Sequence, residues 1–188
     1  MAYYFRPFPL INYDLKKNGK PVLLTNIMQR FKILESFKRQ ERVYYNYSVK
    51  DGERADVIAF KYYDDPSLDW VIYLVNGITD PEFDWPLSTN NLNKFMIKKY
   101  GSIQAAMSQT HHYEQILNLQ TTLFDGTIIP ERFLEVDLTT YNTLPEADKR
   151  IVTAYEYEER LNESKRDIKL MSNEFLLNFL NQVETIFE

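Results

Sequence analysis

The sequence predicts an α+β protein with a strand–helix–helix–strand (βααβ) centre. A β-rich run at residues 47–49 precedes two stretches with apolar residues at helical spacing, near residues 55–63 and 68–75. An Asp-Gly pair at residues 125–126 lies between two β-rich runs, which is typical of a hairpin. From Ser172 onward, an apolar stripe predicts an amphipathic helix. Strands and helices are therefore mixed along the chain.

Composition narrows the class of protein. The 188 residues fit one domain or two small ones, and 44% hydrophobic with 15% aromatic content argues for a folded core. A net charge of -5 without a long basic run argues against a nucleic-acid surface. The absence of cysteine excludes disulfides and thiolate sites and fits folding in a reducing cytosol. The longest clean apolar run, residues 70–75, is far shorter than the ~20 residues that cross a bilayer, so we expect a soluble protein without a signal peptide.

The first segment, residues 1–42, begins with an aromatic arm. Pro7 and Pro9 disfavour helix and keep this arm extended. Aromatic side chains are enriched where proteins meet, so we take the arm as a candidate partner-binding segment, with docking on its own domain as the alternative. The candidate residues are Tyr3, Tyr4, Phe5, Phe8 and Tyr13. A hairpin-like turn at residues 18–19 then leads to a β-rich run at 22–24 and a short expected helix near 26–33, capped by Thr25 or Asn26.

The second segment, residues 43–87, contains the βααβ centre. The strand at 47–49 meets an Asp51-Gly52 turn, and an Asn76-Gly77 pair ends the second helix. One face of each helix is expected to be buried. The apolar residues on the two helices are Val57, Ile58, Phe60, Trp70, Val71, Leu74 and Val75. A proline-punctuated link follows at residues 80–87.

The third segment, residues 88–188, is predicted to be mixed α/β. Ser88 caps a helix that reaches Tyr100, Ser102 starts a shorter helical turn, and residues 111–138 are β structure around the 125–126 turn. Residues 151–157 alternate like a strand, but the Glu156/Arg160 pair favours a helix, which we prefer. The apolar stripe of the last helix is more consistent with core than with interface. Its residues are Phe175, Leu176, Phe179, Leu180, Val183, Ile186 and Phe187.

No constellation predicts catalysis, a metal or a cofactor. The two histidines, His111 and His112, are adjacent and should diverge, so a zinc site would have to recruit carboxylates. Asp80, Glu82 and Asp84 begin like a calcium loop, but the glycine and the bidentate glutamate of that loop are missing. All five glycines fit turns or helix ends, which leaves none for a phosphate-binding loop. We therefore expect a protein that is not an enzyme and needs no cofactor.

The centre resembles a LysM module, a small βααβ unit. The resemblance rests on Tyr47 with Val49, Gly52-Glu53, Ile58-Ala59 with Tyr62, and Asn76-Gly77-Ile78. It implies a shallow groove for N-acetylglucosamine chains. The corresponding positions are Gly52, Glu53, Arg54, Asn76, Gly77, Ile78 and Thr79. Arg54 replaces a small hydroxyl residue and Asp80-Pro81-Glu82 replaces the usual second-strand start, so peptidoglycan binding is the alternative function.

As a whole, the chain is similar to the small baseplate wedge protein of T-even-like contractile-tailed phages, the gene-fifty-three type. An ordered set of short motifs carries this resemblance. They are Pro7-Phe8-Pro9, residues 51–59, residues 65–72, Asn76-Gly77-Ile78 with Asp80-Pro81, residues 156–158 and residues 161–166. The resemblance implies a structural virion protein, made in the host cytoplasm, that completes each wedge and helps wedges join around the hub. Its implied partners are the wedge-core subunits and the lysozyme-like subunit that starts the sheath.

Overall fold

The computed structural model describes residues 4–33 and 40–186, and the contacts of the chain divide it into two compact units. Unit 1 comprises Met1–Pro86 and Lys165–Glu188, and unit 2 comprises Leu87–Ser164. Strands and helices occur in both units, which confirms the α+β class. Tyr3 of the aromatic arm and Phe187 of the terminal stripe lie outside the described residues. The division at residues 42 and 87 stays a prediction.

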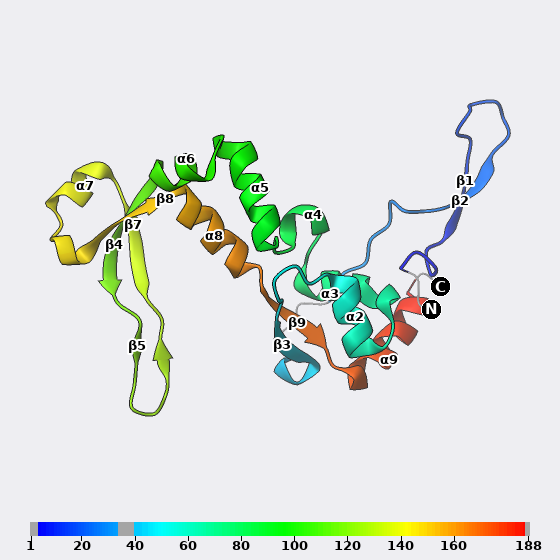
Figure 1. Cartoon of the computed structure of the whole chain (residues 1–188). Helices are drawn as coiled ribbons and strands as arrows, with labels where there is room; N and C mark the ends of the chain where they lie inside the picture. Colours follow the sequence, from blue (N-terminus) through cyan, green and yellow to red (C-terminus); the bar gives the residue numbers. More distant parts are fainter. Residues whose placement is uncertain (1–3, 34–39, 187–188) are drawn as a thin grey trace. The chain divides into compact units, whose positions relative to one another are not determined.

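Unit 1 is built around a two-stranded antiparallel sheet whose strands come from distant parts of the sequence (Figure 1). Strand β3 (Tyr44–Ser48) pairs with β9 (Asp167–Met171), with Tyr44 opposite Met171 and Ser48 opposite Asp167. Between them in sequence lie η2 (Pro66–Leu68) and the helices α2 (Ala55–Tyr63), α3 (Asp69–Asn76) and α4 (Pro81–Asp84). The strand that completes the sheet therefore follows α3 only after all of unit 2.

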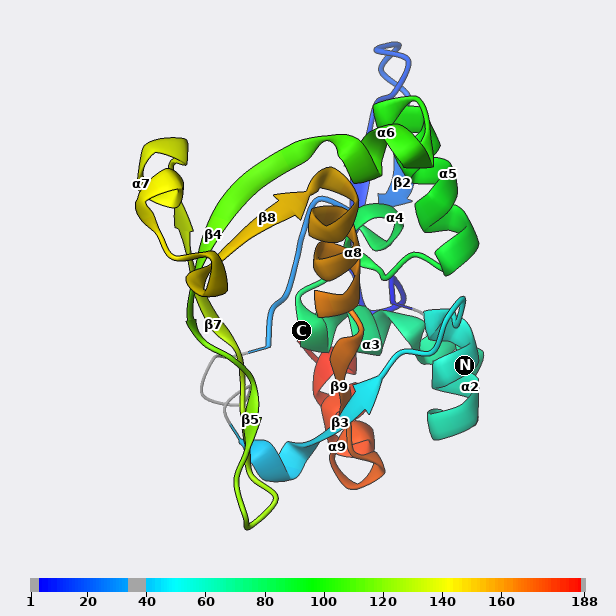
Figure 2. The same ribbon diagram turned by 60° about the vertical axis from the view of Figure 1, so that its left-hand side comes forward.

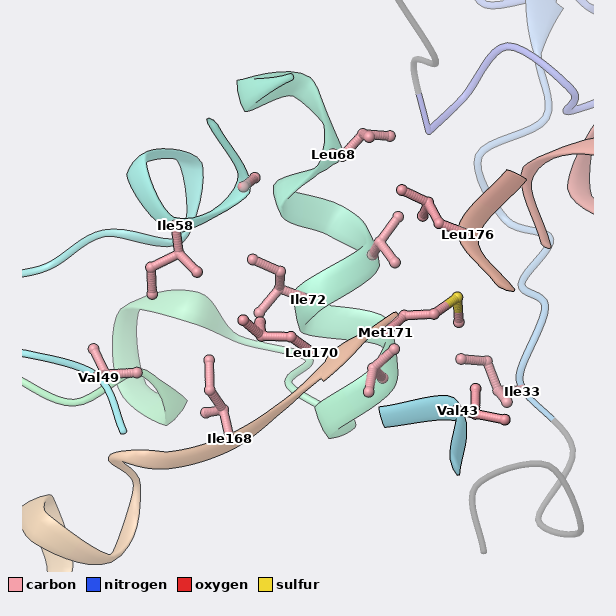
Figure 3. Close-up of a cluster of buried hydrophobic side chains, with 13 residues drawn as sticks. Ile33, Val43, Val49, Ile58, Leu68, Ile72, Ile168, Leu170, Met171 and Leu176 are labelled. Carbon is pink, nitrogen blue, oxygen red and sulfur yellow. The ribbon is translucent and has the colours of Figure 1, made fainter. Parts of the chain in front are cut away.

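The main hydrophobic core of unit 1 lies between α3 and β9, with Ile58 contributed by α2 and Leu176 by α9 (Asn173–Glu184), as Figure 3 shows. Ile72, Leu170 and Met171 are almost completely buried. Full burial of such a side chain contributes roughly 1.5–3 kcal/mol to stability. The terminal helix α9 packs on this core through Leu176, Phe175, Phe179 and Leu180, as its stripe predicted, and Val183 is buried in a second cluster. The expected burial of Ile186 was wrong, since this residue follows the end of α9 and is exposed.

The two helices of the centre begin and end close to the predicted positions, but the buried face of α2 differs from the prediction. Ala55, Ile58 and Ala59 are buried, whereas Val57 and Phe60 are exposed. With 3.6 residues per turn, Ala55, Ile58 and Ala59 share one side of the helix, and Val57 and Phe60 lie on the opposite side. The expected burial of Val57 and Phe60 was wrong.

The segment before η1 (Glu41–Val43) and β3 contains a hairpin and no helix within its described residues, 4–33. Strand β1 (Leu10–Tyr13) pairs with β2 (Val22–Thr25), as the Asn-Gly turn predicted. The predicted helix at 26–33 was wrong. The backbone N–H of Asn26 instead donates to the Pro9 carbonyl at 2.8 Å, and Phe31 and Ile33 are buried in separate hydrophobic clusters. Tertiary packing thus outweighs the local helical spacing.

Unit 2 combines helices with a three-stranded antiparallel sheet in the order β7-β4-β8. Its elements are α5 (Thr89–Tyr100), α6 (Ile103–Ser108), β4 (Thr110–Asn118), β5 (Thr121–Thr122), β6 (Ile128–Ile129), β7 (Arg132–Val136), α7 (Leu138–Thr143), η3 (Glu146–Asp148), β8 (Lys149–Thr153) and α8 (Ala154–Ser164). Figures 1 and 2 show β4 and β7 as a long twisted ribbon with the β5–β6 hairpin at the end remote from α8. The hairpin around residues 125–126 is confirmed.

The ambiguous stretch at 151–157 contains a boundary between strand and helix, so the preference for helix was wrong for its first part. β8 ends at Thr153, and α8 begins at Ala154. Thr153 and Glu156 form a reciprocal capping box: the Thr153 N–H donates to Glu156 Oε2 at 2.8 Å, and the Glu156 N–H donates to Thr153 Oγ1 at 3.2 Å. The alternation from Ile151 thus belongs to β8 and the Glu156/Arg160 pair to α8, and the capping box lies at the boundary between them.

The two ends of unit 2 are tied together by one side chain. Asn162 Nδ2 donates to the Leu87 carbonyl at 3.0 Å, and Asn162 Oδ1 accepts from the Leu87 N–H at 2.7 Å. Asn162 is buried, and these bonds give both the oxygen and the nitrogen of its side-chain amide a partner. The first residue of unit 2 therefore lies beside the end of its last helix, α8. Within residues 4–33 and 40–186, no helix combines the length and the apolarity needed to cross a bilayer.

Candidate functional site

The Glu53 side chain, a candidate sugar contact, binds groups of its own fold. Its Oε2 accepts from the Tyr47 hydroxyl at 2.8 Å and from the Lys50 N–H at 3.2 Å, and its Oε1 pairs with Lys61 Nζ at 2.5 Å. Burial alone would raise the pKa of Glu53, but the hydrogen bonds from Lys61, Tyr47 and the Lys50 backbone outweigh burial and lower that pKa. Glu53 thus links the turn to β3 and α2.

Asn76, another candidate sugar contact, holds the strand β9 in place. Its Nδ2 donates to the Lys169 carbonyl at 2.9 Å, and its Oδ1 accepts from the Lys169 N–H at 2.8 Å. Gly77 follows with φ +68°, and the N–H groups of Gly77 and Ile78 bond back to carbonyls in the last turn of α3. This arrangement is a Schellman motif, in which glycine supplies the left-handed residue.

The other three candidate groove positions lie near the surface. Gly52 forms the turn before α2 with φ +70°, and Arg54 is exposed and pairs with Asp56 at 2.8 Å. The Thr79 N–H donates to the Asp84 carboxylate at 3.3 Å. Structural roles account for the seven positions, so the geometry gives the proposed glycan groove no support.

The aromatic arm is partly docked on unit 1. Phe8 is buried, and the Tyr4 ring lies 5.2 Å from it and 5.4 Å from Trp70, measured between ring centroids. Phe5 and Tyr13 instead remain 51% exposed. The Phe5 ring also lies 4.9 Å from that of Tyr4 and 5.3 Å from that of Phe8, so Phe5 is packed on one side and exposed on the other. Tyr4 and Phe8 are therefore packed, and Phe5 and Tyr13 present about half of their surface to solvent.

The β1–β2 hairpin presents an apolar face that sequence reasoning did not single out. Directly opposed residues of an antiparallel pair project to the same side, and the register pairs Ile11 with Leu24 and Tyr13 with Val22. All four side chains are exposed. Among the described residues the β1–β2 sheet contains no third strand, and a two-stranded sheet is marginally stable by itself in water. We term these four residues the hairpin face. The consecutive apolar residues of β2, Val22 to Leu24, were the available signal.

The β5–β6 end of unit 2 also exposes apolar side chains. They come from the hairpin itself and from the adjoining parts of β4 and β7. The exposed residues are Leu117, Leu119, Leu123, Phe124, Ile128, Ile129, Phe133 and Leu134. Consecutive residues of a strand project to opposite faces, so exposed apolar side chains occur on both faces of this end of the unit, which makes it a candidate contact site. Both units thus carry a surface suited to protein contact.

Comparison with known proteins decides the family. A profile of the family described as "Base plate wedge protein 53" matches residues 2–132, which is more than half of the chain. The chain belongs to this family. It is also 24% identical over 201 residues to "Baseplate wedge protein gp53" of Enterobacteria phage T4, a match that covers 98% of this chain and 94% of that protein. The resemblance predicted from short motifs is confirmed, and the wedge protein is a structural baseplate component.

The sheet of unit 2 in this wedge protein is held by a buried carboxylate. Glu114 is completely buried; its Oε2 accepts from Arg150 Nη2 at 2.6 Å and its Oε1 from Arg160 Nη1 at 2.8 Å. Arg150 also pairs with Glu131 at 3.0 Å. Burial alone would raise the pKa of Glu114, but hydrogen bonds from Arg150 and His112 and the two guanidinium charges lower it. This network links β4, β8 and α8.

The histidines of the wedge protein do not diverge as predicted. The β4–β8 pairing shifts register between Thr110 and His112, and the Nδ1 atoms of His111 and His112 lie 2.8 Å apart. A bulge places two consecutive side chains closer than a regular strand allows. His111 stacks on Tyr157 at 3.8 Å, and His112 Nε2 lies 3.2 Å from Glu114. In the part of the chain that the structure describes, no three acidic or histidine side chains are grouped to hold a metal ion.

Proposed function

We propose that this chain cements the subunits of a baseplate wedge and helps wedges join to one another around the hub, without catalysing a reaction. The observation that carries the proposal is the pair of exposed apolar hairpins in a member of a wedge protein family. A specific interface buries more than about 1,000 Å². Extended hairpins and an aromatic arm can reach that area without a large globular face.

The proposed partners are the wedge-core subunits and the lysozyme-like subunit that starts the sheath. The proposed location is the tail baseplate of the virion, after synthesis in the host cytoplasm. Of the five arm residues, Phe5 and Tyr13 are the described ones with the most exposed side chains, and we assign them to partner contact. Tyr4 and Phe8 are assigned to hold the base of the arm on unit 1.

The centre of unit 1 is proposed to be a LysM-like module used as a scaffold. Its order β3-α2-α3-β9 matches a βααβ unit in which unit 2 is inserted before the last strand. The insertion explains why no strand start follows Ile78. Because Glu53 and Asn76 bind their own fold, we do not propose peptidoglycan as a ligand.

Sedimentation of the purified protein with wedge precursors that lack only this subunit tests the proposal. We expect the protein to sediment with the precursors and the completed wedges to join into rings. Purified peptidoglycan sacculi are the matched control and should not retain the protein. A protein that stays free of the precursors but binds sacculi would contradict the structural role and restore the glycan function.

A further inference from the structure

The charge of the chain is distributed very unevenly. Residues 4–33 carry six basic side chains and one acidic side chain, a net charge of +5, although the whole chain has a net charge of -5. The rest of the chain therefore carries -10. Such asymmetry within one chain indicates that the basic part contacts an acidic surface.

Half of the basic side chains lie in the turn of the β1–β2 hairpin. Lys16, Lys17 and Lys20 are exposed, and none of them has an ion-pair partner among the described residues. The carboxylate of this turn, Asp14, accepts from the N–H groups of Asn18 and Gly19 at 3.1 and 2.7 Å. The three lysine side chains can therefore form ion pairs with another molecule.

The hairpin face lies directly beside these lysines. Ile11, Tyr13, Val22 and Leu24 form a side that is apolar apart from the Tyr13 hydroxyl, while the opposite side pairs Leu10 with Thr25 and Leu23 with Asn12. Removal of an apolar face from water lowers the free energy. A phosphate backbone is charged and hydrated, so it cannot cover such a face. The combination therefore favours a protein partner over a nucleic acid.

We propose that the hairpin face docks on an apolar patch of another wedge subunit, and that carboxylates at the rim of this patch pair with Lys16, Lys17 and Lys20. This inference rests on the proposed wedge-joining function and specifies the chemistry of one partner. Apolar contact supplies affinity, and the lysines speed encounter and fix orientation.

The test measures binding of variants to the wedge precursors that lack this subunit, at two salt concentrations. I11S/L24S should weaken binding about tenfold or more at either salt concentration, because it removes apolar contact. K16E/K17E should weaken binding about tenfold in 0.1 M salt and only about twofold in 0.5 M salt, because salt screens exposed charge. Circular dichroism checks that each variant keeps the wild-type fold.

Two matched controls should bind within about twofold of wild type. L10S/L23S removes two leucines from the opposite side of the same hairpin, and K94E/K98E makes the same charge change on α5.

Equal losses of binding from L10S/L23S and I11S/L24S, or from the two lysine pairs, would overturn the inference. So would loss of wild-type binding after nuclease treatment, or a K16E/K17E effect confined to self-association of the purified protein. Failure of the wild type to bind would refute the proposed function as well, whereas wild-type binding with unaffected variants refutes this inference alone.

Discussion

At the scale of single residues, the Glu114 carboxylate is expected to contribute most to the stability of unit 2. Glu114→Gln keeps the side-chain shape but removes the charge that Arg150 and Arg160 share. Breaking a buried pair from one side costs about 3–5 kcal/mol, and we expect about 3 kcal/mol because Arg150 keeps Glu131. Glu131→Gln is the control, with an expected cost of about 1 kcal/mol or less, since Glu131 is partly exposed.

Chemical denaturation can assign the Glu114→Gln effect to its unit. Both tryptophans, Trp70 and Trp85, lie in unit 1, so their fluorescence follows that unit while far-UV circular dichroism follows both. The substitution should move the dichroism transition and leave the fluorescence transition in place. Equal movement of both would show that the units unfold together, and no movement would contradict the role of Glu114.

The same carboxylate predicts the direction of a pH effect. The pKa of Glu114 is lower in the folded than in the unfolded protein, so its contribution is complete above the unfolded pKa of about 4.3. The contribution decreases as the pH falls toward the folded pKa and is lost below it. The stability difference between wild type and Glu114→Gln should therefore shrink below about pH 4.

Residue roles were predictable from the sequence where they depend on neighbours in the chain. Gly52 and Gly77 were placed correctly in turns because their Asx-Gly pairs require positive φ. The role of Asn76 was not predictable, since its partner Lys169 lies 93 residues away. Glu114 shows the same limit: its guanidinium partners belong to other elements, and burial of a lone glutamate leaves no periodic signal.

At the scale of elements, the capping box between β8 and α8 is expected to fix where the strand ends. Glu156→Ala removes the acceptor of the Thr153 N–H and should cost about 1 kcal/mol. Glu159→Ala, an exposed change on the same helix, is the control and should cost less than about 0.5 kcal/mol. Urea denaturation followed by circular dichroism measures both, and equal costs would contradict the capping role.

Element types were predicted best where caps and periodicity agree. Ser88 and Ser102 each accept a backbone N–H at the start of a helix, as expected. The predicted helix at residues 26–33 does not form although Asn26 was a suitable cap. Asn26 Oδ1 accepts from the Met28 N–H at 3.2 Å in a local turn, and the burial of Phe31 and Ile33 outweighs the helical spacing. In residues 151–157 the T-x-x-E pattern of the capping box was the overlooked signal.

At the scale of the whole molecule, the order of the core follows from long-range pairing that local patterns do not contain. Leu170 and Met171 complete the core of the centre, yet about 90 residues separate them from α3. The strand and the two helices of the centre were therefore predictable from local patterns, whereas the position of β9, the strand that pairs with β3, was not. The Asn162–Leu87 bonds show how the inserted unit returns the chain to its starting point.

This topology predicts that each unit folds without the other. Residues 87–164 have their own core and sheet, so the excised fragment should melt cooperatively. Residues 1–86 joined to 165–188 by about six Gly/Ser residues should fold as well, because Lys165 Nζ bonds to the Phe83 carbonyl at 2.7 Å and the two ends are close. Residues 43–87 alone are the control and should not melt cooperatively, since they lack β9. Thermal melts followed by circular dichroism decide this: a cooperative melt of 43–87, or none from the joined chain, would show that β9 does not complete the centre.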